Sequence, residues 1–182
     1  YNYKFAFYGN DFDMLIDLAS VGTSPKKLKT EFAGALIDLE GEGEVVGDAR
    51  FDGEYYRDEK RVHISGMISA EVAMDCTRCL EPLRRKIEVA FDDVFVDGAH
   101  ESRRSETELT TADLDEALVI GGRVDLTDVV REQILLALPE QIFCREDCRG
   151  LCPKCGGNRN LIDCSCDREE LDPRWAALKN LN

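Results

Sequence analysis

Six of the eight cysteines in this 182-residue chain fall within a short stretch near its carboxyl-terminal end. They are Cys144, Cys148, Cys152, Cys155, Cys164 and Cys166, and the other two form a C-x-x-C pair far upstream, Cys76 and Cys79. Thiolates at two- or three-residue spacing can converge on one ion, because a short loop directs both sulfurs to the same point. Eight soft ligands with only two histidines, His63 and His100, favour tetrahedral zinc over an oxygen-preferring cation.

Eight cysteines suffice for two complete four-cysteine sites, and a site without an open coordination position is structural. The preferred partition places one zinc on Cys152, Cys155, Cys164 and Cys166 and a second on Cys76, Cys79, Cys144 and Cys148. The second site would join two distant parts of the chain. The alternative is a single site of Cys144, Cys148, Cys152 and Cys155, with the other cysteines free. The predicted cofactor is therefore structural zinc, as one or two ions.

Metal is favoured over disulfides by the features expected of the compartment. Residues 1–8 lack the basic start and the small-residue cleavage site of a secretory signal, and no apolar run is long enough for a transmembrane helix. We therefore expect a cytoplasmic protein whose thiols stay reduced, with a disulfide framework as the alternative. Tyr1 is not an initiator and Met14 resembles a natural start, so residues 1–13 are interpreted as an extension or a tag.

The net charge of −14 is unevenly distributed. Residues 144–182 carry seven Lys or Arg and seven Asp or Glu, so the whole negative charge lies in residues 1–143. A protein that coats nucleic acid through its phosphates is basic overall. Any RNA contact of this chain must therefore be local, or the acidic face must attract a basic protein partner.

The segment 14–96 has the alternating pattern of β-strands. Apolar residues alternate with polar ones from about residue 33 onward, and the predicted turns are 41–43, 52–53 and 57–60. The pattern predicts an antiparallel meander with one wet face, and it places Cys76 and Cys79 in a knuckle at a turn between two strands. Residues 97–122 are acid-rich and are interpreted as a flexible loop.

A helix is predicted in residues 123–140, with apolar residues at helical spacing, a cap at Asp125 or Thr127, and an end at Pro139. Its apolar face is expected to cover the sheet. Residues 141–182 form the cysteine-rich zinc-binding tail, in which residues 172–181 are expected to be a short terminal helix. The predicted fold class is thus α+β: an antiparallel β-sheet or meander covered by one main helix, with a C-terminal zinc-knuckle segment.

Several motifs together resemble the YceD family, the large ribosomal RNA subunit accumulation proteins. They are C-T-R-C-L-E-P at 76–82, L-A-L-P at 136–139, C-R-G-L-C-P-K-C-G at 148–156, C-S-C at 164–166 and D-P-R-W-A-A-L-K-N-L at 172–181. The turn at 157–161 departs from the family pattern by being longer. The resemblance implies a bacterial or plastid protein without known catalysis that is needed for normal amounts of large-subunit ribosomal RNA.

The predicted function is a non-enzymatic factor for ribosomal RNA accumulation and 50S ribosome biogenesis. Two isolated histidines and no H-E-x-x-H or paired-acid motif leave no basis for a catalytic zinc. The expected partner is large-subunit ribosomal RNA or a basic ribosomal protein, without a membrane or a small-molecule substrate. A zinc- or thiol-based redox switch is the alternative, because dense thiolates can be oxidised. The candidate contact residues are Arg78, Arg84, Arg85, Lys86, Arg145, Arg149, Lys154 and Arg159.

Overall fold

The computed structural model describes residues 14–98 and 116–166, which divide into two compact units. Within these ranges, unit 1 comprises residues 14–74, 84–98 and 116–140, and unit 2 comprises residues 75–83 and 141–166. The predicted extension at 1–13, most of the acid-rich loop and the terminal helix at 172–181 lie outside the described residues. Among the described helices, none is long and apolar enough to cross a membrane.

Unit 1 is built on a six-stranded sheet with the strand order β2-β4-β5-β6-β7, in which β3 also pairs with β5. The strands are β2 (Lys26–Ala33), β3 (Glu44–Val45), β4 (Asp48–Asp58), β5 (Arg61–Asp75), β6 (Pro82–Asp97) and β7 (Glu116–Val119). A separate antiparallel pair consists of β1 (Leu15–Asp17) and β8 (Arg123–Asp125). Short 3-10 turns occur at Leu18–Ser20 and Gly34–Leu36.

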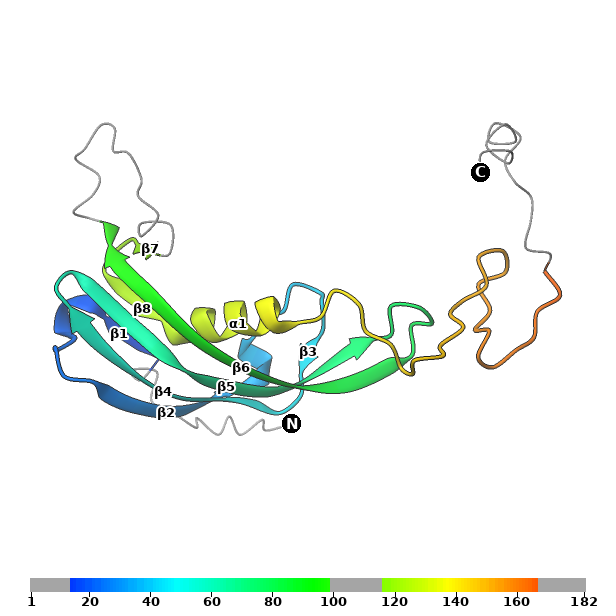
Figure 1. Ribbon diagram of the computed structural model, residues 1–182, viewed down its shortest axis with the longest axis horizontal. Helices are drawn as coiled ribbons and strands as arrows, with labels where there is room; N and C mark the ends of the chain where they lie inside the picture. The colour runs from blue at the N-terminus through cyan, green and yellow to red at the C-terminus, as the bar shows by residue number, and fades with distance from the viewer. Residues whose placement is uncertain (1–13, 99–115, 167–182) are drawn as a thin grey trace, which may run out of the picture. The chain divides into compact units, whose positions relative to one another are not determined.

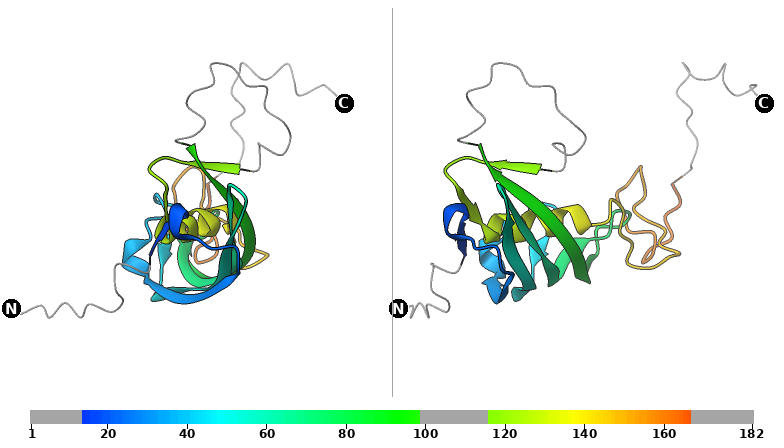
Figure 2. Two further views of the ribbon diagram at one scale, coloured as in Figure 1. Left: turned by 90° about the vertical axis from the view of Figure 1, so that its left-hand side faces the viewer. Right: turned by 60° about the vertical axis from the view of Figure 1, so that its left-hand side comes forward.

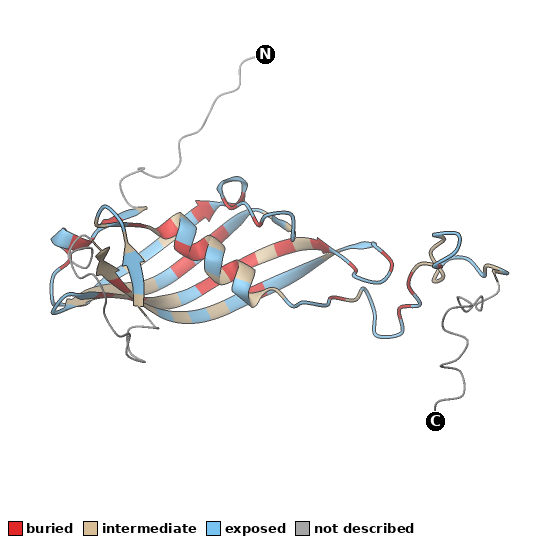
Figure 3. Ribbon diagram, turned by 90° about the horizontal axis from the view of Figure 1, so that it is seen from above, coloured by how far each residue is buried: buried red, intermediate tan, exposed pale blue. Residues whose placement is uncertain are grey.

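The core of unit 1 lies between the sheet and the helix α1 (Leu126–Ala137). Figure 2 shows the sheet curling around this helix, and Figure 3 shows that buried residues occur both in the helix and in the strands. Along β5 buried and partly exposed residues alternate, and Ile64 and Ile68 are completely buried. Val130 and Ile134 of α1 are also completely buried. Within the described residues, one helix covers a largely antiparallel sheet, which agrees with the predicted α+β class.

The start of α1 is fixed by Asp125, one of the two predicted caps. Its side-chain Oδ1 accepts a hydrogen bond from the backbone N–H of Thr127 at 2.8 Å, which satisfies one of the donors left free at a helix start. The helix ends at Ala137, two residues before Pro139, because the residue before a proline disfavours the helical conformation. Figure 1 shows α1 against the sheet formed by β4, β5 and β6.

The structure differs from the sequence expectations at three places. Asp52 and Gly53 do not form a turn but lie inside β4, where Gly53 pairs with Gly66 of β5. A Cβ atom on Gly53 would lie 2.5 Å from the ring of Phe51, so this glycine makes room for a core side chain. Strand β7 arises within the predicted loop and pairs with β6 in parallel, so the sheet is not purely antiparallel. Strand β2 lies ahead of residue 33, where the alternation of apolar and polar residues was expected to begin.

Candidate metal centres

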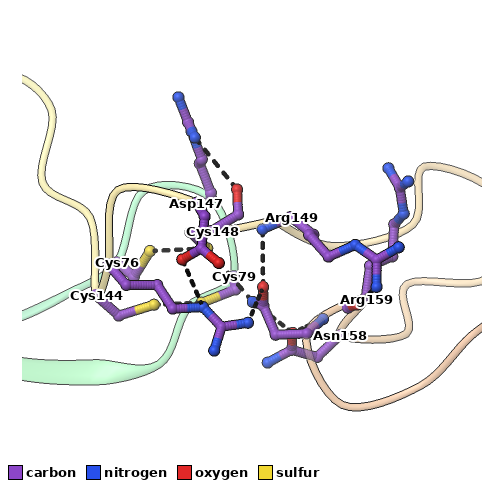
Figure 4. Close-up of polar contacts among 11 residues, drawn as sticks. Cys76, Cys79, Cys144, Asp147, Cys148, Arg149, Asn158 and Arg159 are labelled. Atoms are coloured by element: carbon purple, nitrogen blue, oxygen red, sulfur yellow. Dashed lines mark hydrogen bonds and ion pairs between the residues drawn. The ribbon is translucent and has the colours of Figure 1, made fainter.

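The structure gathers the eight cysteines into two groups of four, both within unit 2. The first cysteine group is Cys76, Cys79, Cys144 and Cys148, and the second cysteine group is Cys152, Cys155, Cys164 and Cys166. Within each group the sulfurs lie within 4.8 Å of one another. Figure 4 shows the residues of the first group converging. These are the two sets of the preferred partition, whereas the four cysteines of the alternative single site are divided between the groups.

Each group contains a C-x-x-C turn, and the two turns have the same pattern of backbone hydrogen bonds. In the first turn, the N–H of Leu80 donates to the carbonyl of Cys76 at 2.9 Å, and the N–H of Cys76 donates to the carbonyl of Glu81 at 2.9 Å. In the second turn, the N–H of Gly156 donates to the carbonyl of Cys152 at 2.8 Å, and the N–H of Cys152 donates to the carbonyl of Gly157 at 2.8 Å.

This construction aims both sulfurs of each turn to one side. Backbone N–H groups inside the turns also hydrogen-bond the first cysteine of each pair, as those of Arg78 and Cys79 do with Cys76. The N–H groups of Lys154 and Cys155 do the same with Cys152. Donors directed at sulfur stabilise the thiolate, which is the form that binds metal.

The spacing of the sulfurs in the first group matches a tetrahedral metal site. The Sγ atoms of Cys76 and Cys148 are 3.8 Å apart, and those of Cys79 and Cys144 are 3.6 Å apart. Four sulfurs at the zinc–sulfur distance of about 2.3 Å from a central ion form a tetrahedron with edges of about 3.8 Å. The donor set and its geometry therefore fit zinc, with Cys76, Cys79 and Cys148 buried and Cys144 exposed.

Two sulfurs of the first group have lowered pKa values and two have raised ones. Burial by itself raises the pKa of Cys76, but hydrogen bonds from backbone N–H groups bring the pKa down to about 6. Burial also opposes ionisation of Cys148, yet the side chain of Asn160 and the backbone at Gly150 lower its pKa. Burial and the neighbouring sulfurs raise the pKa of Cys79 to about 12, and burial raises that of Cys144.

The second group shows the same division. Hydrogen bonds from the backbone of Cys155 and Lys154 lower the pKa of Cys152 to about 6. Hydrogen bonding with Cys155 raises the pKa of Cys166 to about 11, and that with Cys152 raises the pKa of Cys164. Sulfurs this close cannot all carry charge without a cation, because each thiolate disfavours ionisation of the next. A bound divalent ion removes this repulsion and deprotonates the ligands.

Asn158 and Asn160, which were not among the predicted site residues, connect the second group's loop to the first group. The side-chain Nδ2 of Asn160 donates to the Sγ of Cys148 at 3.4 Å, and the Nδ2 of Asn158 donates to the Oε1 of Glu81 at 3.1 Å. Both asparagines belong to the turn at 157–161. An asparagine beside glycines predicts only a turn, so no sequence pattern pointed to these contacts.

The candidate contact residues in unit 2 have different surroundings. The guanidinium of Arg78 lies 3.9 Å from the ring centre of Phe143 and donates to the carbonyl of Cys148, so this residue supports the first group. Arg145 pairs with Asp147, and Arg149 pairs with Asp163. Lys154 is exposed between two cysteines of the second turn, and Arg159 is partly exposed.

The three remaining candidates lie on β6 in unit 1. Arg84, Arg85 and Lys86 are all exposed, and Arg84 approaches Glu71 of β5 at 4.0 Å. The structure therefore divides the eight candidates between the two units. Of the two histidines, His63 stacks on Tyr56 within unit 1, and His100 is outside the described residues. His63 thus contributes to neither cysteine group.

The class of this protein is therefore a two-unit α+β protein. One unit is a curled sheet covered by a helix, and the other contains both four-cysteine groups. The family described as large ribosomal RNA subunit accumulation protein YceD matches residues 64–182, which is more than half of the chain. The chain therefore belongs to the YceD family, as its cysteine and proline motifs predicted. The match includes every residue of both cysteine groups.

Individual relatives agree with this assignment. An uncharacterized protein of Mycobacterium tuberculosis is 30% identical over 175 residues, which cover 90% of this chain and 72% of the relative. The protein YlbN of Bacillus subtilis is 29% identical over 147 residues, which cover 80% of this chain and 81% of YlbN. The chloroplastic YCED homolog 1 of Arabidopsis thaliana, named as a large ribosomal RNA subunit accumulation protein, is 36% identical over 58 residues, 32% of this chain and 18% of the homolog. No solved structure matches the chain.

Proposed function

We propose that the chain is a non-enzymatic, cytoplasmic bacterial factor that supports accumulation of large-subunit ribosomal RNA during 50S ribosome biogenesis. It acts by binding RNA or a ribosomal protein, and structural zinc holds each cysteine group as a knuckle. The observation that carries the proposal is the pairing of YceD family membership with two complete four-cysteine groups. In this view residues 141–182, together with the turn at Cys76 and Cys79, form the zinc-binding part of the protein.

The cysteine groups support a binding role over a catalytic one. A catalytic zinc keeps one position open for water or substrate, whereas four thiolates close the coordination shell. Zinc in such a site stabilises a fold, with apparent binding energies on the order of 10 kcal/mol. The eight cysteines would hold the ions, and the donors from Asn160 and from the backbone of both turns would keep the sulfurs oriented.

Charge favours a basic protein over RNA as the partner. The described part of unit 2 contains five Lys or Arg and five Asp or Glu residues. A divalent ion with four thiolates adds a net charge of about −2 at each group, so the loaded unit is negative. The whole chain already carries −14 before this addition. A surface of this sign repels phosphates and attracts a basic ribosomal protein.

Reversing the charge of one candidate contact residue distinguishes an RNA partner from a basic protein partner. Lys154 is exposed in the second turn, and Lys60 is exposed in the turn between β4 and β5 of unit 1. Lys154→Glu should weaken binding to RNA, because it replaces a phosphate-attracting charge with a repelling one. The same change should leave binding to a basic protein unchanged or strengthen it. Lys60→Glu is the matched control for the change in net charge.

The direct test uses the zinc-loaded full chain with two ligands, purified basic ribosomal proteins of the large subunit and transcribed large-subunit ribosomal RNA. Affinity for a ribosomal protein that exceeds affinity for RNA, and that Lys154→Glu does not reduce, supports the proposed partner. Tight RNA binding that Lys154→Glu weakens, with a steep loss at higher salt, assigns the partner to RNA instead.

The cellular test measures the ratio of large- to small-subunit ribosomal RNA in a host that lacks the chain. We expect this ratio to fall, to recover with the wild-type chain, and not to recover with a Cys76→Ser, Cys152→Ser variant that breaks both groups. Lys60→Glu should restore the ratio fully. An unchanged ratio in the host without the chain would overturn the proposed function.

The exposed Cys144 and Cys155 favour one second candidate, a thiol-based redox switch. One ligand in each group is open to solvent, so an oxidant could reach it and release the ion. The switch predicts zinc release by mild peroxide and its return after reduction. Zinc that stays bound under these conditions excludes this candidate.

A further inference from the structure

We infer that Asn160 is a positioning residue that couples the two cysteine groups, so that loading of one group with metal strengthens metal binding by the other. The inference rests on the proposed zinc sites and adds a mechanism that connects them. Asn160 belongs by sequence to the loop between Cys155 and Cys164 of the second group. Its side chain nevertheless hydrogen-bonds the sulfur of Cys148, a member of the first group.

The orientation of the Asn160 amide is determined by its neighbours. Its Oδ1 accepts hydrogen bonds from the backbone N–H of Arg149 at 2.8 Å and from the Nη2 of Arg145 at 2.9 Å. Both of these groups are donors only, so the oxygen must face them. The Nδ2 group therefore faces the Sγ of Cys148 at 3.4 Å and the Oδ1 of Asn158 at 2.9 Å. The reversed orientation would oppose donors to donors on one side of the amide.

Asn158 holds the loop in the position that this contact requires. Its Oδ1 accepts from the backbone N–H of Asn160 at 3.0 Å, and its Nδ2 donates to the Oε1 of Glu81 at 3.1 Å. The backbone carbonyl of Glu81 also accepts a hydrogen bond from the N–H of Cys76, so the same residue closes the first turn. The Asn160 amide thus donates to a sulfur of the first group, while the Asn158 amide attaches the loop to the first turn.

Backbone hydrogen bonds complete the connection. The N–H of Leu151 donates to the carbonyl of Arg78 at 2.9 Å, and the N–H of Arg159 donates to the carbonyl of Gly150 at 2.9 Å. Gly150 has a φ of +69°, and a Cβ atom there would lie 3.0 Å from the carbonyl oxygen of Arg78. The segment between Cys148 and Cys152 therefore lies between the first turn and the loop of the second group.

Coupling follows from what each ion does to the loop. An ion in the second group fixes both ends of the loop, at Cys155 and Cys164, and so holds the Asn160 amide against Cys148. A hydrogen bond to a ligand sulfur stabilises the thiolate and orients it, and loss of such an outer contact typically weakens metal binding by about 10- to 100-fold. Without the second ion, the loop is not held in place at its ends. The free energy needed to order it then reduces the affinity of the first group for zinc. Linkage makes the effect reciprocal.

The test measures zinc affinity of each group in the full chain by competition with a chromogenic chelator. Mass spectrometry of alkylated cysteines reports which group has lost its ion at each step. Asn160→Asp has the same shape but presents a carboxylate oxygen to the Cys148 sulfur in place of the N–H. We expect it to lower the first group's affinity at least tenfold while the second group stays loaded. Gln141→Glu, which adds the same negative charge at an exposed position of unit 2, is the matched control and should have no effect on the first group.

A second measurement leaves Asn160 untouched and remains decisive if Asn160→Asp disrupts the loop. Cys164→Ser with Cys166→Ser dismantles the second group and should weaken zinc binding by the first group. Cys76→Ser with Cys79→Ser should weaken the second group by the same factor. Adding Asn160→Asp to the variant without a second group should reduce affinity less than it does in the intact chain.

A wild-type chain that binds two zinc ions, together with a first-group affinity that neither Asn160→Asp nor loss of the second group changes, would overturn the coupling and leave the proposed zinc sites intact. A wild-type chain that binds no zinc would overturn both. The two failures are therefore distinguishable in the same experiment.

Discussion

Leu80 and Gly156 occupy equivalent positions in the two C-x-x-C turns, each directly after the second cysteine of its pair. Both have left-handed backbone conformations, with φ of +59° for Leu80 and +71° for Gly156. Each donates its N–H to the carbonyl of the first cysteine in its turn. Glycine adopts this conformation without steric cost, whereas a leucine places its Cβ against the backbone.

Replacing Leu80 with glycine should stabilise the first turn. The left-handed conformation costs a residue with a Cβ atom roughly 1 kcal/mol, and glycine relieves it at the price of greater freedom in the unfolded chain. We therefore expect Leu80→Gly to raise the urea concentration at which half of the first group's zinc is released, by a gain of at most about 1 kcal/mol.

Leu80→Ala is the matched control for this substitution. It removes the same side chain, which is 61% exposed, but keeps the Cβ atom that causes the strain. We expect the alanine variant to release zinc at the same urea concentration as the wild type or a lower one. Equal behaviour of the glycine and alanine variants would show that backbone strain at Leu80 does not limit the first turn.

The close pair of Gly53 and Gly66 makes a prediction for the core of unit 1. A Cβ atom on Gly66 would lie 2.7 Å from the Cα of Gly53 and 2.7 Å from the ring of Phe51. Because backbone must move to admit it, Gly66→Ala should destabilise unit 1 by about 1–3 kcal/mol. Far-ultraviolet circular dichroism during urea unfolding measures the change.

Gly22→Ala is the control, because a Cβ atom there meets nothing within 4 Å. It should change the free energy of unfolding by less than about 0.5 kcal/mol. Zinc content should be unaffected by either change, since both glycines lie in unit 1. A Gly66→Ala variant as stable as Gly22→Ala would contradict the tight packing beneath Phe51.

The elements that could be predicted from the sequence are those with a local repeating signal. The apolar spacing around Val130 and Ile134 indicated α1, and the alternation around Ile64 and Ile68 indicated β5. Cysteine count and spacing indicated two groups, because a closed tetrahedral site needs four sulfurs. The helix and strand signals are readable within a few residues, whereas the two cysteine groups follow from the count and spacing of cysteines along the whole chain.

The features that could not be predicted depend on contacts between distant residues. Strand β7 is short, and it pairs in parallel with residues of β6 that lie 22 positions earlier in the sequence. Gly53 was interpreted as a turn residue because it follows Asp52, and only its pairing with the distant Gly66 shows that it lies inside β4. Asn160 is recognised only when Cys148 is beside it, since hydrogen bonds from amide side chains follow no sequence period.

Asp93 of β6 gives unit 1 a pH-dependent stability. Burial raises the pKa of its carboxyl, and the negative charge of Glu132 raises it further, although Gln133 donates a hydrogen bond to it at 3.0 Å. A carboxyl whose folded pKa is raised destabilises the fold when ionised. This penalty is fully present above the folded pKa and disappears as the pH falls to the ordinary carboxyl value of about 4.

Asp93→Asn should therefore stabilise unit 1 at neutral pH, with an advantage over the wild type that shrinks as the pH approaches about 4. The asparagine oxygen can still accept the hydrogen bond from Gln133. Urea unfolding at several pH values, with a chelator present so that the metal state of unit 2 is constant, measures the difference. Asp58→Asn at the exposed end of β4 corrects for the loss of one negative charge. A constant advantage at all pH values would contradict the raised pKa of Asp93.

Metal content provides the most direct prediction for unit 2. We expect two zinc ions per chain in protein purified without added metal, because each cysteine group offers four convergent sulfurs. Elemental analysis gives the ion count, and thiol titration before and after chelation should show no reactive thiols at first and eight afterwards. Cys76→Ser and Cys152→Ser should each reduce the count by one ion, while Ser165→Ala, beside two cysteines of the second group, should retain both. A result of one zinc and about four reactive thiols would show that one group binds no metal. Oxidised cysteines without zinc would show that the cysteines form disulfides instead of metal sites.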